Sequence, residues 1–328
     1  MVYCFSYYRY QRTFAKPLQT ARGEWFLREG FVLRAESDLG VGYGEIAPIP
    51  EFGTETIAQA CAFLDQLVDA PDLAEDSATL AGLPCCAFGL SAALAGRASV
   101  PARDYRVAGL LPAGSAALAQ VATKLDSGYH TFKWKIGVAP VDVEQALFRE
   151  LVAQLPMGAR LRLDANGGLS VAALQDWLSM LQDFSEVVEY IEQPLPVGQE
   201  AEMSRFAASS RVPVALDESL NGASGTRWLA EWDGPLVVKP ALMGDCAALL
   251  QCLRPVADRV TLSSVFETAV GLQNALCFAD QLPGYKQAIG FDTLAAFTDS
   301  LMPFSSAPVI GAGERAQLVP ETIWNQLT

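Results

Sequence analysis

The sequence predicts an α/β protein with a modified (β/α)8 (TIM-type) barrel and an N-terminal α+β capping domain. The first observation is a series of short apolar runs that end at Lys135, Asp164, Glu192, Asp217 and Lys239, in steps of 22 to 29 residues. One strand and one helix fill that length in a parallel βα unit, and repeated units close into a barrel. The second observation is that strand-like stretches precede helix-like ones near the N-terminus, which is typical of an α+β domain.

Three segments are expected: a capping domain over residues 1–98, a catalytic barrel over residues 99–302, and a return to the capping domain over residues 303–328. The capping domain contains predicted strands at 2–14 and 24–46, a hairpin candidate within Trp25–Ala35, and helices at about 56–69 and 84–94. The barrel contains predicted strands at 105–111, 131–136 and 260–264 and helices at 115–127, 140–154 and 266–279. The pattern does not define the last unit, near 285–300.

Composition excludes several classes of protein. The chain has 328 residues, a net charge of −14, seven cysteines without a CxxC motif, and one histidine, His130. A nucleic-acid-binding protein needs a basic surface, so no such partner is expected. Neither a long apolar run nor a signal-like N-terminus is present, so we expect a cytoplasmic location and no membrane partner. A lone histidine leaves little scope for histidine-based catalysis or a His-rich zinc site.

Two lysines lie two residues apart in the apolar run at 131–136. Alternation along a strand places Lys133 and Lys135 on one face and Phe132 and Trp134 on the other. In a barrel, the lysine face would point to the mouth at the carboxyl ends of the strands, where the chemistry of such folds occurs. Repulsion from Lys133 would make Lys135 a better base near neutral pH.

Three acids end the runs that follow, at Asp164, Glu192 and Asp217. Carboxylates on adjacent strand ends form an all-oxygen site that suits Mg²⁺, with Mn²⁺ as an alternative ion. The competing interpretation is that each acid caps the helix after it. Lys135 and Lys239 would face each other across this site, so a small-molecule carboxylate would present its α-carbon to both. Removal of the α-proton gives an enediolate, which the metal and a cationic lysine stabilise.

This set of residues resembles the enolase superfamily, whose sites combine Lys or His bases with Mg²⁺. The Lys-x-Lys motif and the lysine beyond the acids match the subgroup with a lysine on each side of the substrate. The single histidine argues against the branches that use a His base. Within the subgroup the sequence is similar to the o-succinylbenzoate synthase family, in the segments 42–48, 52–56, 161–166, 191–194, 215–219, 236–240 and 262–271.

The resemblance implies a lyase that dehydrates 2-succinyl-6-hydroxy-2,4-cyclohexadiene-1-carboxylate to o-succinylbenzoate, in menaquinone or phylloquinone biosynthesis. It implies that Lys135 removes the α-proton and returns it to the departing hydroxide, while Lys239 stabilises the dienolate. Asn166 and Glu218 are expected to orient the metal ligands. The sequence does not define whether the protein is a monomer or a homo-oligomer.

Five further residues are candidates for substrate binding. Arg162 is expected to meet a substrate carboxylate or, alternatively, to pair with an acid inside the barrel. Ser263 and Ser264 are expected to donate to the substrate or else to cap the next helix. Phe52 and Gly53 are expected to shape the pocket wall.

Two alternatives to the synthase reaction remain open. The first is another enzyme of the same scaffold, an N-acylamino acid racemase or a dipeptide epimerase, since both also need two lysines. Against the epimerase, Gly290-Phe291-Asp292 does not match the Asp-x-Asp that would hold a substrate amine. The second is a metal-binding scaffold without catalytic activity, which the presence of all five mouth residues disfavours.

Overall fold

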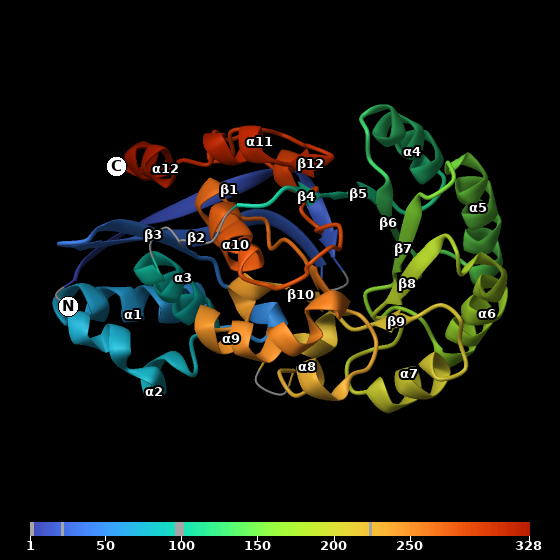
Figure 1. Ribbon diagram of the computed structural model, residues 1–328, viewed down its shortest axis with the longest axis horizontal. Coiled ribbons are helices and arrows are strands. Elements are labelled where there is room, and N and C mark those ends of the chain that lie inside the picture. The colour runs from blue at the N-terminus through green and yellow to red at the C-terminus, as the bar shows by residue number, and fades with distance from the viewer. Residues whose placement is uncertain (1–2, 21–22, 96–101, 223–224) are drawn as a thin grey trace.

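The computed structural model describes residues 3–20, 23–95, 102–222 and 225–328. An N-terminal antiparallel sheet with its helices lies beside a parallel barrel, and the C-terminal helices lie over the sheet (Figure 1). The boundary predicted between residues 98 and 99 lies outside the described residues. No helix among the described residues has both the length and the apolar character needed to cross a membrane.

The N-terminal sheet is a meander of long strands, β1 (Cys4–Thr20), β2 (Gly23–Ser37) and β3 (Gly40–Ile46). The hairpin predicted within Trp25–Ala35 is wrong, because β2 runs through that stretch without a break. Gly30 in this strand makes room for Tyr10 of β1, since a Cβ at Gly30 would lie 2.5 Å from the Tyr10 hydroxyl oxygen. The glycine therefore serves close side-chain packing and not a turn.

The helices of this domain are α1 (Ile57–Asp69), α2 (Ser77–Leu80) and α3 (Pro84–Ala95). Helix α3 packs directly on the backbone of β3. A Cβ at Gly44 would lie 1.8 Å from the carbonyl oxygen of Gly89, and one at Gly42 would lie 1.9 Å from that of Ala93. The glycines that punctuate β3 are thus required by the approach of the two backbones.

The barrel is built from parallel strands that are hydrogen-bonded in sequence order, which are β5 (Ala108–Leu111), β6 (Thr131–Lys135), β7 (Arg160–Asp164), β8 (Val188–Glu192), β9 (Val214–Ala215), β10 (Leu236–Val238) and β11 (Val260–Leu262). Isolated bridges complete the ring. Leu216 pairs with Leu236, and residues 289 and 290 pair with Val107 and Ser263. Residues 289–290 therefore supply the eighth strand, and the predicted barrel is confirmed.

Helices surround the barrel (Figure 1), namely α4 (Ala116–Asp126), α5 (Val141–Gln154), α6 (Val171–Leu181), α7 (Glu200–Ala207), α8 (Trp228–Glu231), α9 (Cys246–Leu253) and α10 (Ala269–Asp280). Phe132 and Trp134 of β6 are fully buried on the outer face, and the Trp134 ring lies 6.4 Å from that of Trp177 in α6. Because side chains alternate along a strand, this packing turns Lys133 and Lys135 into the barrel, as predicted.

The C-terminal segment contacts both parts of the molecule. Strand β12 (Val309–Ile310) pairs with β4 (Tyr105–Arg106), which immediately precedes the barrel. Helices α11 (Ala312–Gln317) and α12 (Pro320–Leu327) follow, and the ring of Trp324 in α12 lies 4.5 Å from that of Tyr8 in β1. The end of the chain therefore packs against the N-terminal sheet.

Candidate active site

The predicted site residues lie at the carboxyl ends of neighbouring barrel strands. In the sheet register Lys135 is paired with Asp164, and Asp164 is paired with Glu192. Asp217 lies just beyond β9, and Lys239 lies just beyond β10. Parallel strands in register bring their ends to one mouth, so the structure gathers all of these side chains there.

The lysines and the acids form close ion pairs. The Lys133 Nζ lies 2.8 Å from Oδ2 of Asp164 and 2.5 Å from Oε1 of Glu192. The Lys239 ammonium binds the carboxylate of Asp217. Lys133 is thus shared by two carboxylates, which offsets the repulsion that the sequence predicted it would exert on Lys135.

Burial and charge shift the acid–base equilibria of this cluster. Burial opposes the charge of Lys133 and of Lys239, but neighbouring carboxylates outweigh it and raise the pKa of both lysines. Burial alone would raise the pKa of Asp217, yet Lys239 and Lys133 outweigh it and lower that pKa. Burial, and then repulsion from Asp164, raises the pKa of Glu192 well above its usual range, although Lys133 acts against the shift. Ionisation of all three acids together would therefore leave more negative charge than the two lysines compensate, and it is opposed without a further cation.

The three acids have the donor atoms that a hard divalent cation prefers, but their present orientation does not place them around one ion. Their donors are all carboxylate oxygens, and the buried Oε2 of Glu192 has no hydrogen-bond partner. However, no three acidic, histidine or cysteine side chains among the described residues are placed to hold one ion. Asp164 and Asp217 instead face the ammonium groups of Lys133 and Lys239. A set of carboxylate oxygen donors nevertheless suits Mg²⁺.

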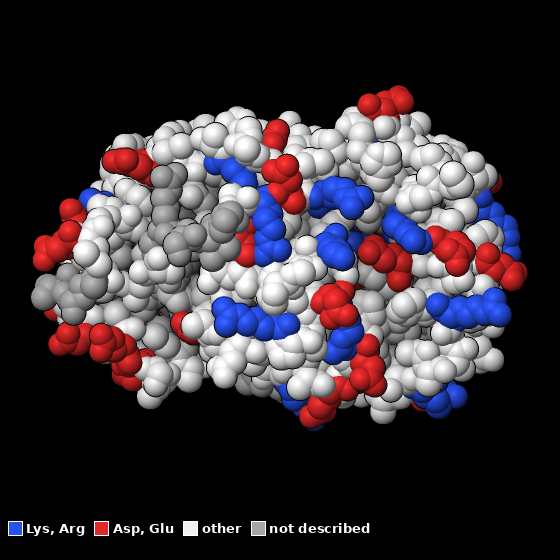
Figure 2. Space-filling view, in the orientation of Figure 1, with Lys and Arg blue, Asp and Glu red and all other residues white. Residues whose placement is uncertain are grey.

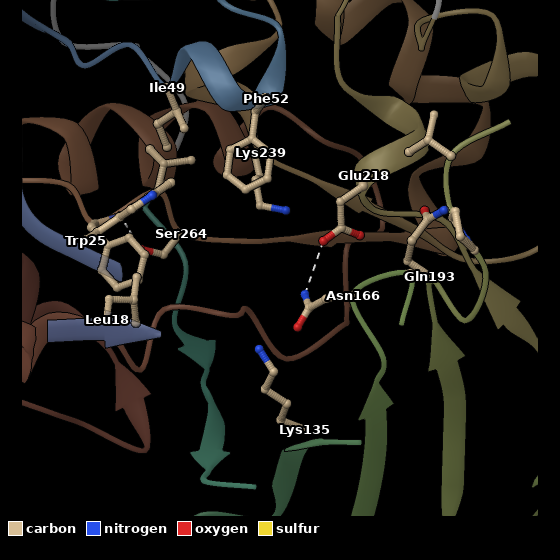
Figure 3. A pocket seen from close by; sticks show the side chains of 15 residues that line it. Leu18, Trp25, Ile49, Phe52, Lys135, Asn166, Gln193, Glu218, Lys239 and Ser264 are labelled. Carbon is tan, nitrogen blue, oxygen red and sulfur yellow. Dashed lines mark hydrogen bonds between the residues drawn. The ribbon is translucent and has the colours of Figure 1, made fainter. Parts of the chain in front are cut away.

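A cavity of about 330 Å³ opens beside this cluster. Lys135 and Lys239 enter it from opposite sides, and Asn166 and Glu218 lie between them on a third side (Figure 3). The strands that carry the lysines, β6 and β10, are four apart in the order around the barrel, which explains their opposition. A flat substrate between them would expose one face to each amine.

Asn166 and Glu218 interact as a pair. The Asn166 Nδ2 donates to Oε1 of Glu218 at 3.1 Å, and the Asn166 backbone N–H donates to Oδ1 of Asp164 at 3.0 Å. Burial, and then repulsion from Asp217, raises the pKa of Glu218 to about 7. Asn166 has a φ of 45°, in the left-handed region that glycine favours and that asparagine adopts more readily than other residues. The pair thus lies beside the predicted ligands Asp164 and Asp217.

The predicted substrate contacts fall into two groups. Phe52 and Ser264 line the cavity, and the Lys239 Nζ lies 5.5 Å from the centroid of the Phe52 ring. Gly53 and Ser263 are not among the described residues that line it. Gly53 instead ends the short helical turn Pro50–Phe52 with a φ of 83°, directly after the wall residue Phe52.

Arg162 requires a correction. Its side chain is 1% exposed, and its Nε donates to Oε2 of Glu189 at 2.6 Å while its Nη1 donates to the carbonyl of Ala288 at 2.9 Å. It shares the inward face with Asp164 but precedes it by two residues, one layer deeper in the barrel. The structure therefore supports the internal ion pair and contradicts the predicted substrate contact.

Gln193 is a site residue that the sequence reasoning missed. It is fully buried, and its Oε1 accepts the backbone N–H groups of Asp217 and Ser219 at 3.0 and 3.1 Å. It therefore fixes the backbone that carries Asp217. Its position directly after Glu192 at a strand end was the available signal. The apolar wall residues Leu18, Trp25, Ile49 and Phe266 were missed as well.

The comparisons with known proteins agree with this geometry. Residues 4–97 match the family model described as MenC, N-terminal domain, and residues 116–247 match the model described as enolase C-terminal domain-like. Fold and site together define a barrel enzyme of the enolase superfamily. A curated o-succinylbenzoate synthase from Thermosynechococcus vestitus is 39% identical over 272 residues, which are 80% of this chain and 84% of that protein. This chain belongs to the o-succinylbenzoate synthase family.

Solved structures extend the comparison. A crystal structure of o-succinylbenzoate synthase from Thermosynechococcus elongatus BP-1, complexed with Mg in the active site, matches with a TM-score of 0.82 and 34% identity over 98% of this chain and 99% of that chain. The L-Ala-D/L-Glu epimerase from Bacillus subtilis matches with a TM-score of 0.78, but at 19% identity over 94% of this chain and 95% of that chain. The second likeness concerns the fold alone.

Proposed function

We infer that this protein is an o-succinylbenzoate synthase, a magnesium-dependent lyase that dehydrates 2-succinyl-6-hydroxy-2,4-cyclohexadiene-1-carboxylate to o-succinylbenzoate. The observation that carries this conclusion is the opposition of Lys135 and Lys239 across a cavity beside three carboxylates. Family membership supports the same reaction. The product is a precursor of menaquinone, and a role in phylloquinone synthesis is part of the proposal.

We propose that Asp164, Glu192 and Asp217 hold the Mg²⁺, with Mn²⁺ as a substitute. When bound, such an ion stabilises the negative charge that develops on a carboxylate as its α-proton is removed. Supporting this role are the all-oxygen donors, the unpartnered Oε2 of Glu192 and the raised pKa of Glu192, since a bound cation would stabilise the ionised form of this buried acid. Lys133 then acts within the machinery as the cation that keeps Asp164 and Glu192 close together.

In the proposed reaction Lys135 takes the proton from the carbon that bears the ring carboxylate. The C–H electron pair moves into the ring, the C–O bond to the hydroxyl group breaks, and Lys135 returns the proton so that water leaves. Lys239 remains charged on the opposite face and stabilises the dienolate. No oxidant or reductant is needed, because the loss of water alone makes the ring aromatic.

The division of the chain supports this chemistry. We propose that residues 99–302 supply the catalytic groups, while residues 1–98, with the return segment 303–328, cover the cavity. Leu18, Trp25 and Phe52 reach the cavity from the N-terminal part and provide an apolar wall beside the charged groups. Such a wall excludes water from the base and strengthens its electrostatic interactions.

The proposed partner is a small carboxylate, in a cytoplasmic protein that binds neither nucleic acid nor membrane. The net charge of −14 supports this, and on the face in Figure 2 the basic side chains are interspersed with acidic ones. Fractionation of cells that produce the protein tests the location.

A second activity of the same site is N-acylamino acid racemisation, favoured by the presence of a lysine on each side of the cavity. An epimerase acting on dipeptides is disfavoured. Asp292 accepts from the Tyr129 hydroxyl at 2.8 Å and binds Lys124, and it is not among the described cavity residues. Incubation of an N-succinyl L-amino acid in D₂O separates the cases, since α-deuteration with loss of optical rotation indicates racemisation.

The deciding experiment is an ultraviolet assay for the aromatic product. Purified protein with Mg²⁺ should form o-succinylbenzoate, and chelation with EDTA should stop the reaction until Mg²⁺ is restored. Protein that is folded by circular dichroism and still forms no product at saturating Mg²⁺ would refute the proposed function. Absence of deuterium exchange with every carboxylate offered would favour a scaffold without catalytic activity.

A further inference from the structure

The cavity wall after β11 has a conformation that needs support. Ser264, Val265 and Phe266 line the cavity, and residues 264–268 belong to the connection between β11 and α10. Phe266 has a φ of 65°, which is rarely adopted by a bulky side chain. The Ser264 hydroxyl accepts from the Phe266 backbone N–H at 3.0 Å and binds Oε2 of Glu267 at 2.6 Å. We call residues 264–268 the β11–α10 loop.

The N-terminal sheet contacts four consecutive residues of this loop. Arg28 of β2 donates to the carbonyl of Val265, and the ring of Phe14 in β1 lies 5.2 Å from that of Phe266. The next two positions are held by Arg12 of β1, whose Nη1 donates to the carbonyl of Glu267 at 2.7 Å, and by Glu45 of β3, whose carboxylate accepts the backbone N–H of Thr268 at 3.0 Å. The sheet therefore supports this strained loop at each of these positions, in addition to the hydrogen bonds that the loop makes within itself.

Arg28 links this loop to a second wall of the same cavity. Its Nε donates to Val265 O at 3.0 Å, while Nη1 and Nη2 donate to the carbonyls of Pro48 and Ala47 at 2.7 and 2.5 Å. Residue 49, which follows Pro48, lines the cavity. Arg28 itself is 4% exposed and does not line the cavity. One planar guanidinium thus sets the separation of two walls, a geometry that the single ammonium of lysine cannot reproduce.

We propose that Arg28 is a positioning residue of the synthase reaction, which rests on the proposed function above. It holds the β11–α10 loop against the segment that contains Ala47 and Pro48, and so fixes the width of the cavity beside the substrate. The walls that it holds contact parts of the substrate that do not react. Those contacts are the same before and during proton transfer, so their loss should raise KM and leave kcat nearly unchanged.

The test compares Arg28→Lys with Arg315→Lys as a matched control. Arg315 is also largely buried and binds Asp280 at 2.6 Å, but at the other end of α10. The Arg28 variant should raise KM for the cyclohexadiene substrate about tenfold, equivalent to about 1.4 kcal/mol of lost binding, with kcat within about twofold. The Arg315 variant should keep the wild-type KM even if its melting temperature falls. A role in stability alone would lower the melting temperature of both variants and leave both KM values unchanged.

A second variant keeps the proposal testable if Arg28→Lys does not fold. Phe14→Leu retains an apolar side chain but loses the ring contact with Phe266, and it should raise KM in the same direction. Wild-type KM in every folded variant that alters Arg28 or Phe14, with an active wild-type enzyme, would overturn the proposal. Failure of the proposed function is recognised separately, because the wild-type protein itself would then form no product.

Discussion

Replacement of Lys135 by alanine should remove catalysis while leaving the fold intact. Among the described residues, the Lys135 side chain takes part in no ion pair, whereas Lys133 and Lys239 each bind buried carboxylates. Its loss should therefore change the free energy of unfolding by no more than about 0.5 kcal/mol, as for substitutions that disturb no packing or pairing. A general base raises the rate about 10²- to 10⁴-fold, which corresponds to lowering the activation free energy by about 3–5 kcal/mol. Because Lys135 would act twice, we expect the upper part of that range.

The assay follows the aromatic product by ultraviolet absorbance at saturating Mg²⁺, with thermal unfolding measured on the same preparations. Lys286→Ala is the control, because Lys286 is exposed and lies outside the cavity. It should retain both full activity and the wild-type melting temperature. An alanine variant at Lys135 with turnover near wild type would refute its assignment as the base. A large fall in the melting temperature of this variant would refute the inference that the Lys135 side chain contributes little to stability.

Three other predictions follow from the ion pairs and buried acids. Lys239→Ala leaves Asp217 buried without its partner, so in magnesium-free protein it should lower the free energy of unfolding by about 3–5 kcal/mol. A denaturant titration that shows no change in this free energy would contradict the pairing. Arg162→Met should destabilise the protein, since it leaves Glu189 unpaired, but should not alter KM in the variant that still folds; a selective rise in KM would restore Arg162 as a substrate contact. Glu218 keeps its proton in the folded protein up to about pH 7 but releases it near 4.5 when unfolded, so its stabilising effect is complete below pH 4.5 and is lost as the pH rises to about 7. Glu218→Gln should flatten this fall in chelator-treated protein, and an unchanged pH profile of the unfolding midpoint would contradict the raised pKa.

The barrel and its charged mouth could be predicted because their signals are local. The steps between Asp164, Glu192 and Asp217 follow from the length of a βα unit, and alternation placed Lys133 and Lys135 on one face, which the predicted barrel turns inward. The roles assigned to these residues remain proposals, but their gathering at one mouth required no knowledge of tertiary structure.

The remaining features depend on contacts between distant segments. Leu18 and Trp25 reach the cavity only because the N-terminal sheet packs over the barrel, and no pattern near them encodes that position. For Arg162 the sequence left a substrate contact and an internal ion pair open, because the depth of a side chain in the barrel depends on tertiary packing. The eighth strand was missed because only residues 289–290 pair with their neighbours. Two residues are too few to show the alternation of apolar and polar side chains that predicts a strand.

The position of Asp292 limits how this scaffold could acquire new specificity. Its carboxylate accepts the Leu110 backbone N–H at 2.8 Å and also binds Lys124 and Tyr129, so it connects the chain after the eighth strand to the first strand of the barrel and the helix that follows it. Turning Asp292 inward to bind a substrate amine would break these three contacts. The connection between the last and first strands of the barrel would then be weakened. An acid that binds a substrate amine would instead have to arise at a neighbouring position, while Asp292 keeps its contacts.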